Sequence, residues 1–336
     1  MHPRSVYNQP MPKRNRFGFV LAAAAGAATA AAVVQFQIEK REAEAKLRWG
    51  STLIETARGP VECAVMGEGP AVLISHGALG GYDQGLALGR PLADAGFTVV
   101  AVSRPGYLRT PLSTGPAPEA QADAHNALLD ALGIERAAIL GASAGGISAL
   151  HFAIRHPQRC RALILMCAII HQVPASEMYA VPGARTIMNL LRHDFAVWLG
   201  LKAGRFAPLA GMGDPNIRRA AAGGTAQHAM FEGFLNSVFP PSPRWVGVEN
   251  DLFRIEHLRP APMESIAAPT LILHGEQDPL ASVAHARTAA SLIPGAQLIT
   301  YGGGADHGFF ISRYDEVWPQ ITAFLKTHLA QDPSGS

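Results

Sequence analysis

One short stretch, GASAGG at residues 141–146, constrains the fold of this chain more than any other. It directly follows the apolar run AAIL (137–140) and leads into ISALHFAIRH (147–156), which has a helical pattern. A turn built from glycine, alanine and one serine is tighter than larger side chains allow. We therefore predict a sharp strand-to-helix junction whose one reactive side chain is that of Ser143.

Around this junction, apolar runs alternate with helical segments from about Trp49 onward. The runs AVLISHG (71–77), FTVVAVS (97–103) and RALILMCA (161–168) are almost wholly apolar. Strands of this kind, separated by helices, are typical of a parallel sheet that helices cover on both faces. The sequence therefore predicts an α/β protein with a mostly parallel, twisted sheet.

The alternation stops over residues 169–263 and resumes with APTLILHGEQD (268–278). The interrupting stretch contains helical segments separated by glycine and proline clusters. An insertion of this length is usually functional rather than a simple loop. We predict an α/β core formed by residues 49–168 and 264–330, and a helical cap formed by residues 169–263.

The turn also satisfies the pattern G-x-S-x-G, which suits a serine nucleophile. A serine hydroxyl is weak until a base removes its proton, and that base is usually a histidine oriented by a carboxylate. His307 lies between the last apolar run and the last helical segment, where its side chain can reach over the sheet to Ser143. Asp278 is the candidate carboxylate; Glu276 competes with it, whereas Asp306 is interpreted as a loop residue.

Five short motifs occur in order along the chain: SHGALGG (75–81), SRPGY (103–107), GASAGG, LHGEQDPL (273–280) and GGGADHGF (302–309). With these motifs, the chain from about residue 49 to 330 resembles the α/β-hydrolase family. The resemblance implies the order serine, acid, histidine, and it places the acid just before Pro279, at Asp278. It further implies an oxyanion hole formed by the backbone N–H groups of Ala78 and Ala144. His76 is interpreted as a structural residue.

These residues predict a serine hydrolase, most specifically a carboxylesterase that acts on an apolar, uncharged ester through an acyl-enzyme. Aromatic residues of the cap are expected to line an apolar access path: Phe195, Trp198, Phe231, Phe234, Phe239 and Trp245. Thioesterase, lactonase, C–C hydrolase, perhydrolase or haloperoxidase, and aminopeptidase chemistry use the same triad and stay open. The alternative from another class is a non-catalytic ligand-binding protein on the same fold.

The N-terminal part has the pattern of a membrane anchor. Residues 1–16 are basic and contain no acid, and the uncharged run 17–38 spans 22 residues, whereas about 20 residues suffice to cross the hydrocarbon core. We predict a single-pass signal anchor, followed by a linker at 39–48; a cleaved signal peptide and a soluble helix or disordered tail are the alternatives. Four Lys and Arg residues lie on each side of the run, so their distribution does not determine the orientation of the chain. The basic segment before the run contains no acid and resembles the start of a signal sequence. This favours an extracytoplasmic catalytic domain, either anchored or secreted.

Composition argues against several other functions. The formal net charge of +2 is too small to indicate nucleic-acid binding. The histidines and cysteines lack metal-ligand spacing, and neither a P-loop nor a dinucleotide fingerprint is present, so we expect no metal or cofactor. The three cysteines, Cys63, Cys160 and Cys167, are interpreted as small buried apolar residues.

Overall fold

The computed structural model describes residues 16–180, 182–204, 212–220 and 225–329. The chain divides into two compact units, Met1–Glu42 and Ala43–Ser336. Most of the basic N-terminal segment lies outside the described residues. The first unit consists, where it is described, of the N-terminal part of helix α1 (Arg16–Trp49).

Helix α1 contains the uncharged run from which a membrane anchor was predicted. Among the described residues, however, none of the helices combines the length and the apolar character that a membrane crossing requires. The prediction of a spanning helix therefore has no support from the structure.

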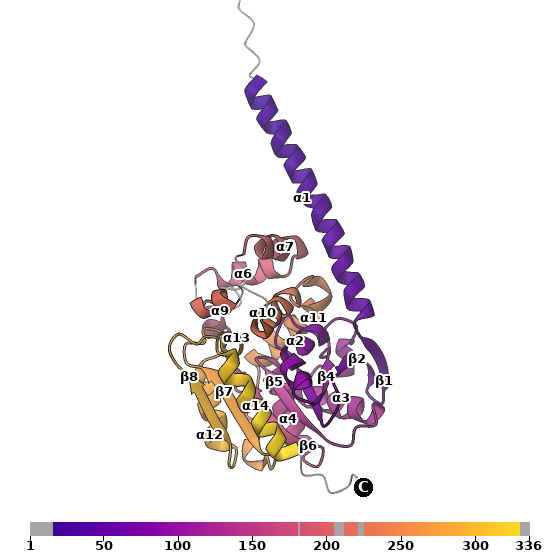
Figure 1. Cartoon of the computed structure of the whole chain (residues 1–336), viewed down its shortest axis with the longest axis vertical. Coiled ribbons are helices and arrows are strands. Elements are labelled where there is room, and N and C mark those ends of the chain that lie inside the picture. The colour runs from indigo at the N-terminus through magenta and orange to yellow at the C-terminus, as the bar shows by residue number, and fades with distance from the viewer. Residues whose placement is uncertain (1–15, 181, 205–211, 221–224, 330–336) are drawn as a thin grey trace, which may run out of the picture. The chain divides into compact units, whose positions relative to one another are not determined.

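The second unit is built on an eight-stranded sheet with the strand order β1-β2-β4-β3-β5-β6-β7-β8 (Figure 1). Strand β2 runs antiparallel to both β1 and β4, and the other neighbouring pairs are parallel. This arrangement confirms the predicted mostly parallel sheet. The strands are β1 (Thr52–Thr56), β2 (Gly59–Met66), β3 (Ala71–Ser75), β4 (Thr98–Val102), β5 (Ala137–Ala142), β6 (Cys160–Met166), β7 (Thr270–Gly275) and β8 (Gln297–Tyr301).

Helices cover both faces of the sheet, because alternate strand residues point to opposite sides. On β3, Val72 and Ile74 pack with α2 (Tyr82–Asp94) and α14 (Tyr314–Leu329). Leu73 faces the other way and packs with α3, α4 and α12. These three helices span Pro118–Ala131, Gly145–Arg155 and Val283–Leu292. Both faces are therefore apolar cores, as the almost wholly apolar strand sequences predict.

Between β6 and β7 the described residues form helices and no strand. These helices gather at one end of the sheet (Figure 1). They are α5 (Ala175–Met178), α6 (Ala184–Leu191), α7 (Asp194–Lys202), α9 (Pro215–Ala220), α10 (Ala226–Asn236) and α11 (Trp245–Glu256). We call this segment the cap. The short helix α13 (Phe309–Ser312) follows the loop that carries His307.

Candidate active site

The predicted junction between β5 and α4 places Ser143 in a strained conformation. Its φ angle is +51°, in the left-handed region that non-glycine residues rarely adopt. The neighbouring glycines leave no room for side chains. A Cβ atom at Gly141 would lie 2.6 Å from the Cβ of Ala149, and one at Gly145 would overlap the carbonyl oxygens of Ser75 and His76. The small residues therefore permit strand, loop and helix to approach while Ser143 faces a cavity.

That cavity has a volume of about 190 Å³ and lies between the sheet and the cap. Ser143, His307 and Ala78 line it from the core, and apolar side chains of α6, α10 and α11 line it from the cap. Of the six aromatic residues predicted to form the access path, Phe234 alone is in this lining. Phe195 is exposed, and Trp198, Phe231 and Phe239 are buried outside this lining.

Asp278 orients His307 through a short hydrogen bond. The Nδ1 atom of His307 lies 2.7 Å from Oδ2 of Asp278. The other carboxylate oxygen accepts the backbone N–H groups of Leu280 and Ala281 at 2.8 and 2.9 Å. Glu276, the competing acid, instead accepts a hydrogen bond from Thr300 at the surface. The structure thus pairs Asp278 with His307.

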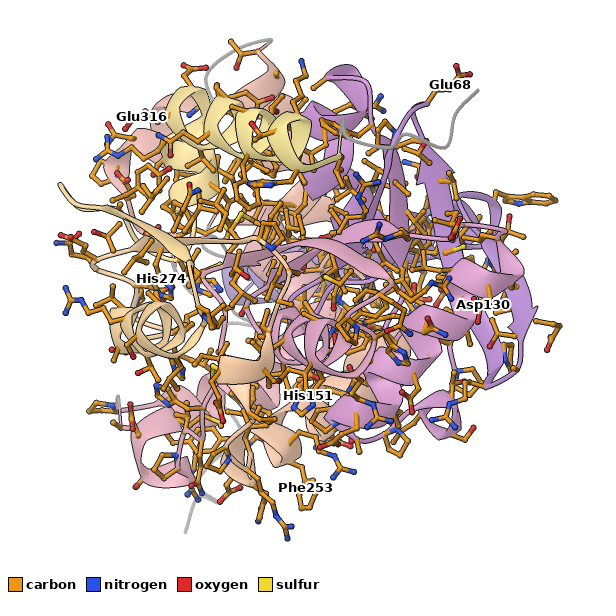
Figure 2. The ribbon with its side chains drawn as sticks, turned by 90° about the horizontal axis from the view of Figure 1, so that it is seen from below. Glu68, Asp130, His151, Phe253, His274 and Glu316 are labelled. Atoms are coloured by element: carbon orange, nitrogen blue, oxygen red, sulfur yellow. The ribbon has the colours of Figure 1, made fainter. Side chains whose placement is uncertain are left out.

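His274 is a further neighbour of this carboxylate that sequence reasoning did not single out. It lies on β7, four residues before Asp278, is 1% exposed, and is labelled in Figure 2. Its Nε2 atom donates to the carbonyl oxygen of Ala281 at 2.8 Å and lies 3.4 Å from Asp278 Oδ2. His274 therefore fixes the turn that carries the acid. Asp306, next to His307, accepts the backbone N–H groups of Gly308 in its own loop and of Asp214 in the cap, so it joins these two segments.

The electrostatic environment of this pair favours an ionised Asp278. Burial by itself raises the pKa of Asp278, but His307 and His274, together with the Ala281 N–H, bring it below its ordinary value of 3.8. For His307, burial has the opposite effect and lowers the pKa, because it disfavours the charged imidazolium. The neighbouring Cys167 and the Asp278 carboxylate outweigh burial and raise the His307 pKa well above 6.5. A carboxylate that stabilises the imidazolium is what a histidine base requires.

Cys167 is the second residue that sequence reasoning missed as a member of the site. It follows β6, has a φ angle of +42° and is 1% exposed. It lines the cavity together with His307, and it is among the neighbours that raise the His307 pKa. Among the described residues, no hydrogen bond joins Ser143 to His307. Catalytic hydrogen bonds often tighten only when substrate binds, so this spacing is compatible with proton transfer.

The predicted oxyanion donors lie at the same end of the sheet. Ala78 follows β3 in the loop 76–80, and Ala144 follows Ser143 at the start of α4. In the described part of the chain, neither backbone N–H donates to a protein group, so both are available to a ligand. His76 is structural, as predicted: its Nε2 accepts the Arg104 backbone N–H at 3.0 Å. Burial and the neighbouring Arg104 lower its pKa well below 6.5.

Two ion pairs, each with a buried guanidinium group, hold the loop 76–80 against the cap. Arg104 of the core forms a two-pronged contact with Asp251 of α11, at 2.8 and 2.6 Å, and donates to the His76 carbonyl oxygen. Arg244 of the cap forms a similar contact with Asp83 of α2, at 3.0 and 2.7 Å, and donates to the Gly80 carbonyl oxygen. We call these two pairs the core–cap clamps. They bind the two ends of the loop, at His76 and Gly80. In one pair the core supplies the cation, and in the other the cap supplies it.

Comparison with known proteins identifies the family to which this arrangement belongs. The model of the alpha/beta hydrolase fold matches residues 70–312. The chain is a member of the α/β-hydrolase fold family. The solved structure of an alpha/beta hydrolase fold protein from Nakamurella multipartita is 30% identical, with a TM-score of 0.69, and the match covers 82% of this chain and 99% of that one.

Relatives of this family member include two kinds of hydrolase. A 2-hydroxy-6-oxo-6-phenylhexa-2,4-dienoate hydrolase from Comamonas testosteroni is 38% identical over 143 residues, which are 38% of this chain and 50% of that protein. A pimeloyl-[acyl-carrier protein] methyl ester esterase from Aromatoleum aromaticum is 29% identical over 231 residues, 67% of this chain and 86% of that protein. The chain spans about half the length of the curated relatives it matches first.

Proposed function

We propose that this α/β-hydrolase is a serine carboxylesterase that acts on apolar, uncharged esters. The observation that carries the proposal is the cavity lined jointly by Ser143 and by His307, whose Nδ1 atom lies 2.7 Å from the Asp278 carboxylate. A nucleophile, a base and an orienting acid on three separate strand ends are the arrangement that acyl transfer requires.

In the proposed reaction, Ser143 Oγ attacks the ester carbonyl carbon while His307 Nε2 accepts the hydroxyl proton. The Ala78 and Ala144 N–H groups bind the oxyanion of the tetrahedral intermediate, where one such donor contributes about 3 kcal/mol in other enzymes. His307 then gives its proton to the departing alkoxide, leaving an acyl group on Ser143. A water molecule, activated by His307, attacks that acyl group and releases the carboxylic acid. Asp278 stays ionised throughout and stabilises the imidazolium.

The charge of the cavity supports an uncharged substrate. Its lining over the described residues contains no Lys or Arg. The one carboxylate besides the proposed machinery, Asp251, is neutralised by Arg104. An anionic substrate would therefore lose its hydration without gaining a cationic partner.

A C–C hydrolase is the second candidate, and the similarity to the Comamonas testosteroni hydrolase favours it. The same Ser143, His307 and Asp278 would serve that reaction. The cavity argues against it, because the relative's named substrate is a dienoate, whose carboxylate calls for a basic residue in the lining. If the enzyme hydrolysed a dienoate faster than simple esters, the C–C hydrolase would become the first candidate and the carboxylesterase the second.

The test is hydrolysis of p-nitrophenyl esters, from acetate to palmitate, by the full-length protein. We expect turnover that Ser143→Ala abolishes and that a fluorophosphonate blocks by labelling Ser143. Ser312→Ala is the matched control, because the Ser312 hydroxyl is buried without a partner in the described structure and does not line the cavity. If the wild type neither turns over any ester nor reacts with the fluorophosphonate, the proposal fails and a non-catalytic binding role becomes the better explanation.

For the location of the enzyme, we propose from the sequence alone a membrane-associated, extracytoplasmic catalytic domain. Fractionation of cells that express the full chain, followed by protease treatment of intact cells, tests this. Release of the protein by an alkaline carbonate wash, or protection from external protease, would contradict the respective half of the proposal.

A further inference from the structure

The side chain of Gln84 presents an unused hydrogen-bond donor at the catalytic cavity. Gln84 lies in the first turn of α2, is 1% exposed and lines the cavity together with Ser143 and Ala78. Its Oε1 atom accepts the backbone N–H of Gly77 at 2.9 Å. An amide accepts only through its oxygen, so this bond fixes the orientation of the whole group. Nε2 is buried and has no partner among the described residues.

An unpaired buried amide N–H is costly, since it loses its hydration without compensation. Other buried polar groups in this region do have hydrogen-bond partners. His76 Nε2, the guanidinium of Arg104 and that of Arg244 all form hydrogen bonds within the protein. Of these groups, Nε2 of Gln84 lacks an acceptor among the described residues, and it belongs to a residue that lines the cavity, where a ligand could supply one.

The position of Gln84 places that acceptor close to the reacting carbonyl. The amide is bound to Gly77, the residue before the proposed oxyanion donor Ala78. Gly77 itself adjoins the nucleophile, since a Cβ atom there would lie 3.2 Å from the Cβ of Ser143. An oxygen atom one or two bonds from the scissile carbonyl carbon would thus lie within reach of Nε2.

We propose that Gln84 is a specificity-determining residue whose Nε2 donates a hydrogen bond to a second, neutral oxygen of the substrate. This rests on the proposed esterase function and narrows its substrate class to esters with an ether, keto or carbonyl oxygen near the scissile bond. A neutral acceptor is specified because the described lining holds no Lys or Arg that would stabilise a carboxylate there.

The experiment compares two p-nitrophenyl esters of equal length, the pentanoate and the ethoxyacetate, in which one ether oxygen replaces a methylene. The intrinsic difference in reactivity between the two esters cancels when the ratio of their kcat/KM values is compared between protein variants. Gln84→Glu keeps an acceptor for the Gly77 N–H but loses the amide donor. Gln84→Met has a similar volume and loses both functions.

We expect each variant to lower the ratio of ethoxyacetate to pentanoate kcat/KM by roughly 3- to 10-fold, the effect of one neutral hydrogen bond. An additional loss for both esters alike in Gln84→Met reports the Gly77 contact and does not enter the ratio. An unchanged ratio in both variants would overturn the proposal, because Gln84 would then only hold the loop or donate to the oxyanion common to all esters.

Failure of the esterase proposal is distinguishable, because it appears as absent turnover of both esters by the wild type. In that event, calorimetry of methyl ethoxyacetate and methyl pentanoate binding to Ser143→Ala, with and without Gln84→Met, repeats the comparison without catalysis. A preference for the ethoxyacetate that disappears with Gln84→Met supports the role of Nε2. Equal affinities of the two ligands for Ser143→Ala would overturn it.

Discussion

The sheet side of the cavity holds its functional groups through backbone geometry, whereas the cap side contributes packed apolar side chains. Leu79, Ser143 and Cys167 on the sheet side all have positive φ angles, of +59°, +51° and +42°. The cap lining, including Met188, Leu191 and Leu252, comes from ordinary helices. Strain of this kind persists only where the surrounding fold fixes it. The proposed chemistry thus depends on exact positions, and the proposed selectivity depends on shape.

The largest effect should come from the sheet side. Ser143→Ala removes the proposed nucleophile and leaves the cap unchanged, so we expect kcat to fall by about 10⁴- to 10⁶-fold. Steady-state assays with a p-nitrophenyl ester measure this, and the melting temperature serves as the folding control. Residual activity within tenfold of the wild type would show that the catalytic groups lie elsewhere.

The clamps that join the two sides should govern stability. Asp251→Ala leaves the Arg104 guanidinium, 1% exposed, without its counter-charge, and removing one partner of a buried pair costs about 3–5 kcal/mol. Urea unfolding of the purified variants measures the loss. The double variant Arg104→Leu/Asp251→Leu should recover most of it, because no isolated charge remains.

The exposed pair Arg90–Asp94 provides the control for this experiment. Both of its side chains are more than half exposed, and their charged atoms are 3.9 Å apart. Asp94→Ala should change the free energy of unfolding by less than about 1 kcal/mol. An equal effect of Asp94→Ala and Asp251→Ala would contradict the importance of the clamp.

On the cap side, effects should be graded. Leu252→Phe reduces the cavity, so we expect the preferred acyl chain to shorten and kcat/KM for longer esters to fall roughly tenfold. Phe253→Leu is the matched control: the adjacent residue is 51% exposed and points away from the protein body (Figure 2). A change of chain-length preference in the control alone would place the acyl site outside the cavity.

The smallest predicted effect is a shift in pH dependence. His307 must be neutral to act as a base, so kcat/KM should rise with pH through the His307 pKa. Cys167 raises that pKa; Cys167→Ala should therefore move the acidic limb of the profile to lower pH. Cys63→Ala is the control, because burial raises the pKa of this thiol to about 11 and the residue does not line the cavity. A shift to higher pH in Cys167→Ala would contradict the assigned cause.

Features that depend on neighbouring residues in the chain were predictable from the sequence. The junction at Ser143 and the position of Asp278 follow from short patterns at strand ends, where the parallel sheet brings side chains together. Cys167 escaped notice because it ends an apolar run and resembles a core residue. Gln84 was missed because it lies in a helix, and the sequence pattern of that helix does not indicate a hydrogen-bond donor for a ligand.

Contacts between residues that no local pattern marks were not predictable. Arg104 and Asp251 are separated by 147 positions, and no local pattern links them. The aromatic residues of the cap illustrate the same limit. Their composition suggested an access path, but helix packing decides which side chain faces the cavity, and of that set Phe234 lines it.

The opposite polarity of the two clamps has a consequence for exchanging caps between family members. The core supplies one cation and one anion, Arg104 and Asp83, and the cap supplies their complements, Asp251 and Arg244. A foreign cap would dock in register only if it carried an acid and a base at these two places. A core produced without its cap would expose one unpaired charge of each sign beside the loop that holds Ala78. Chimeric enzymes in this scaffold therefore need to be designed around four residues before any substrate contact is considered.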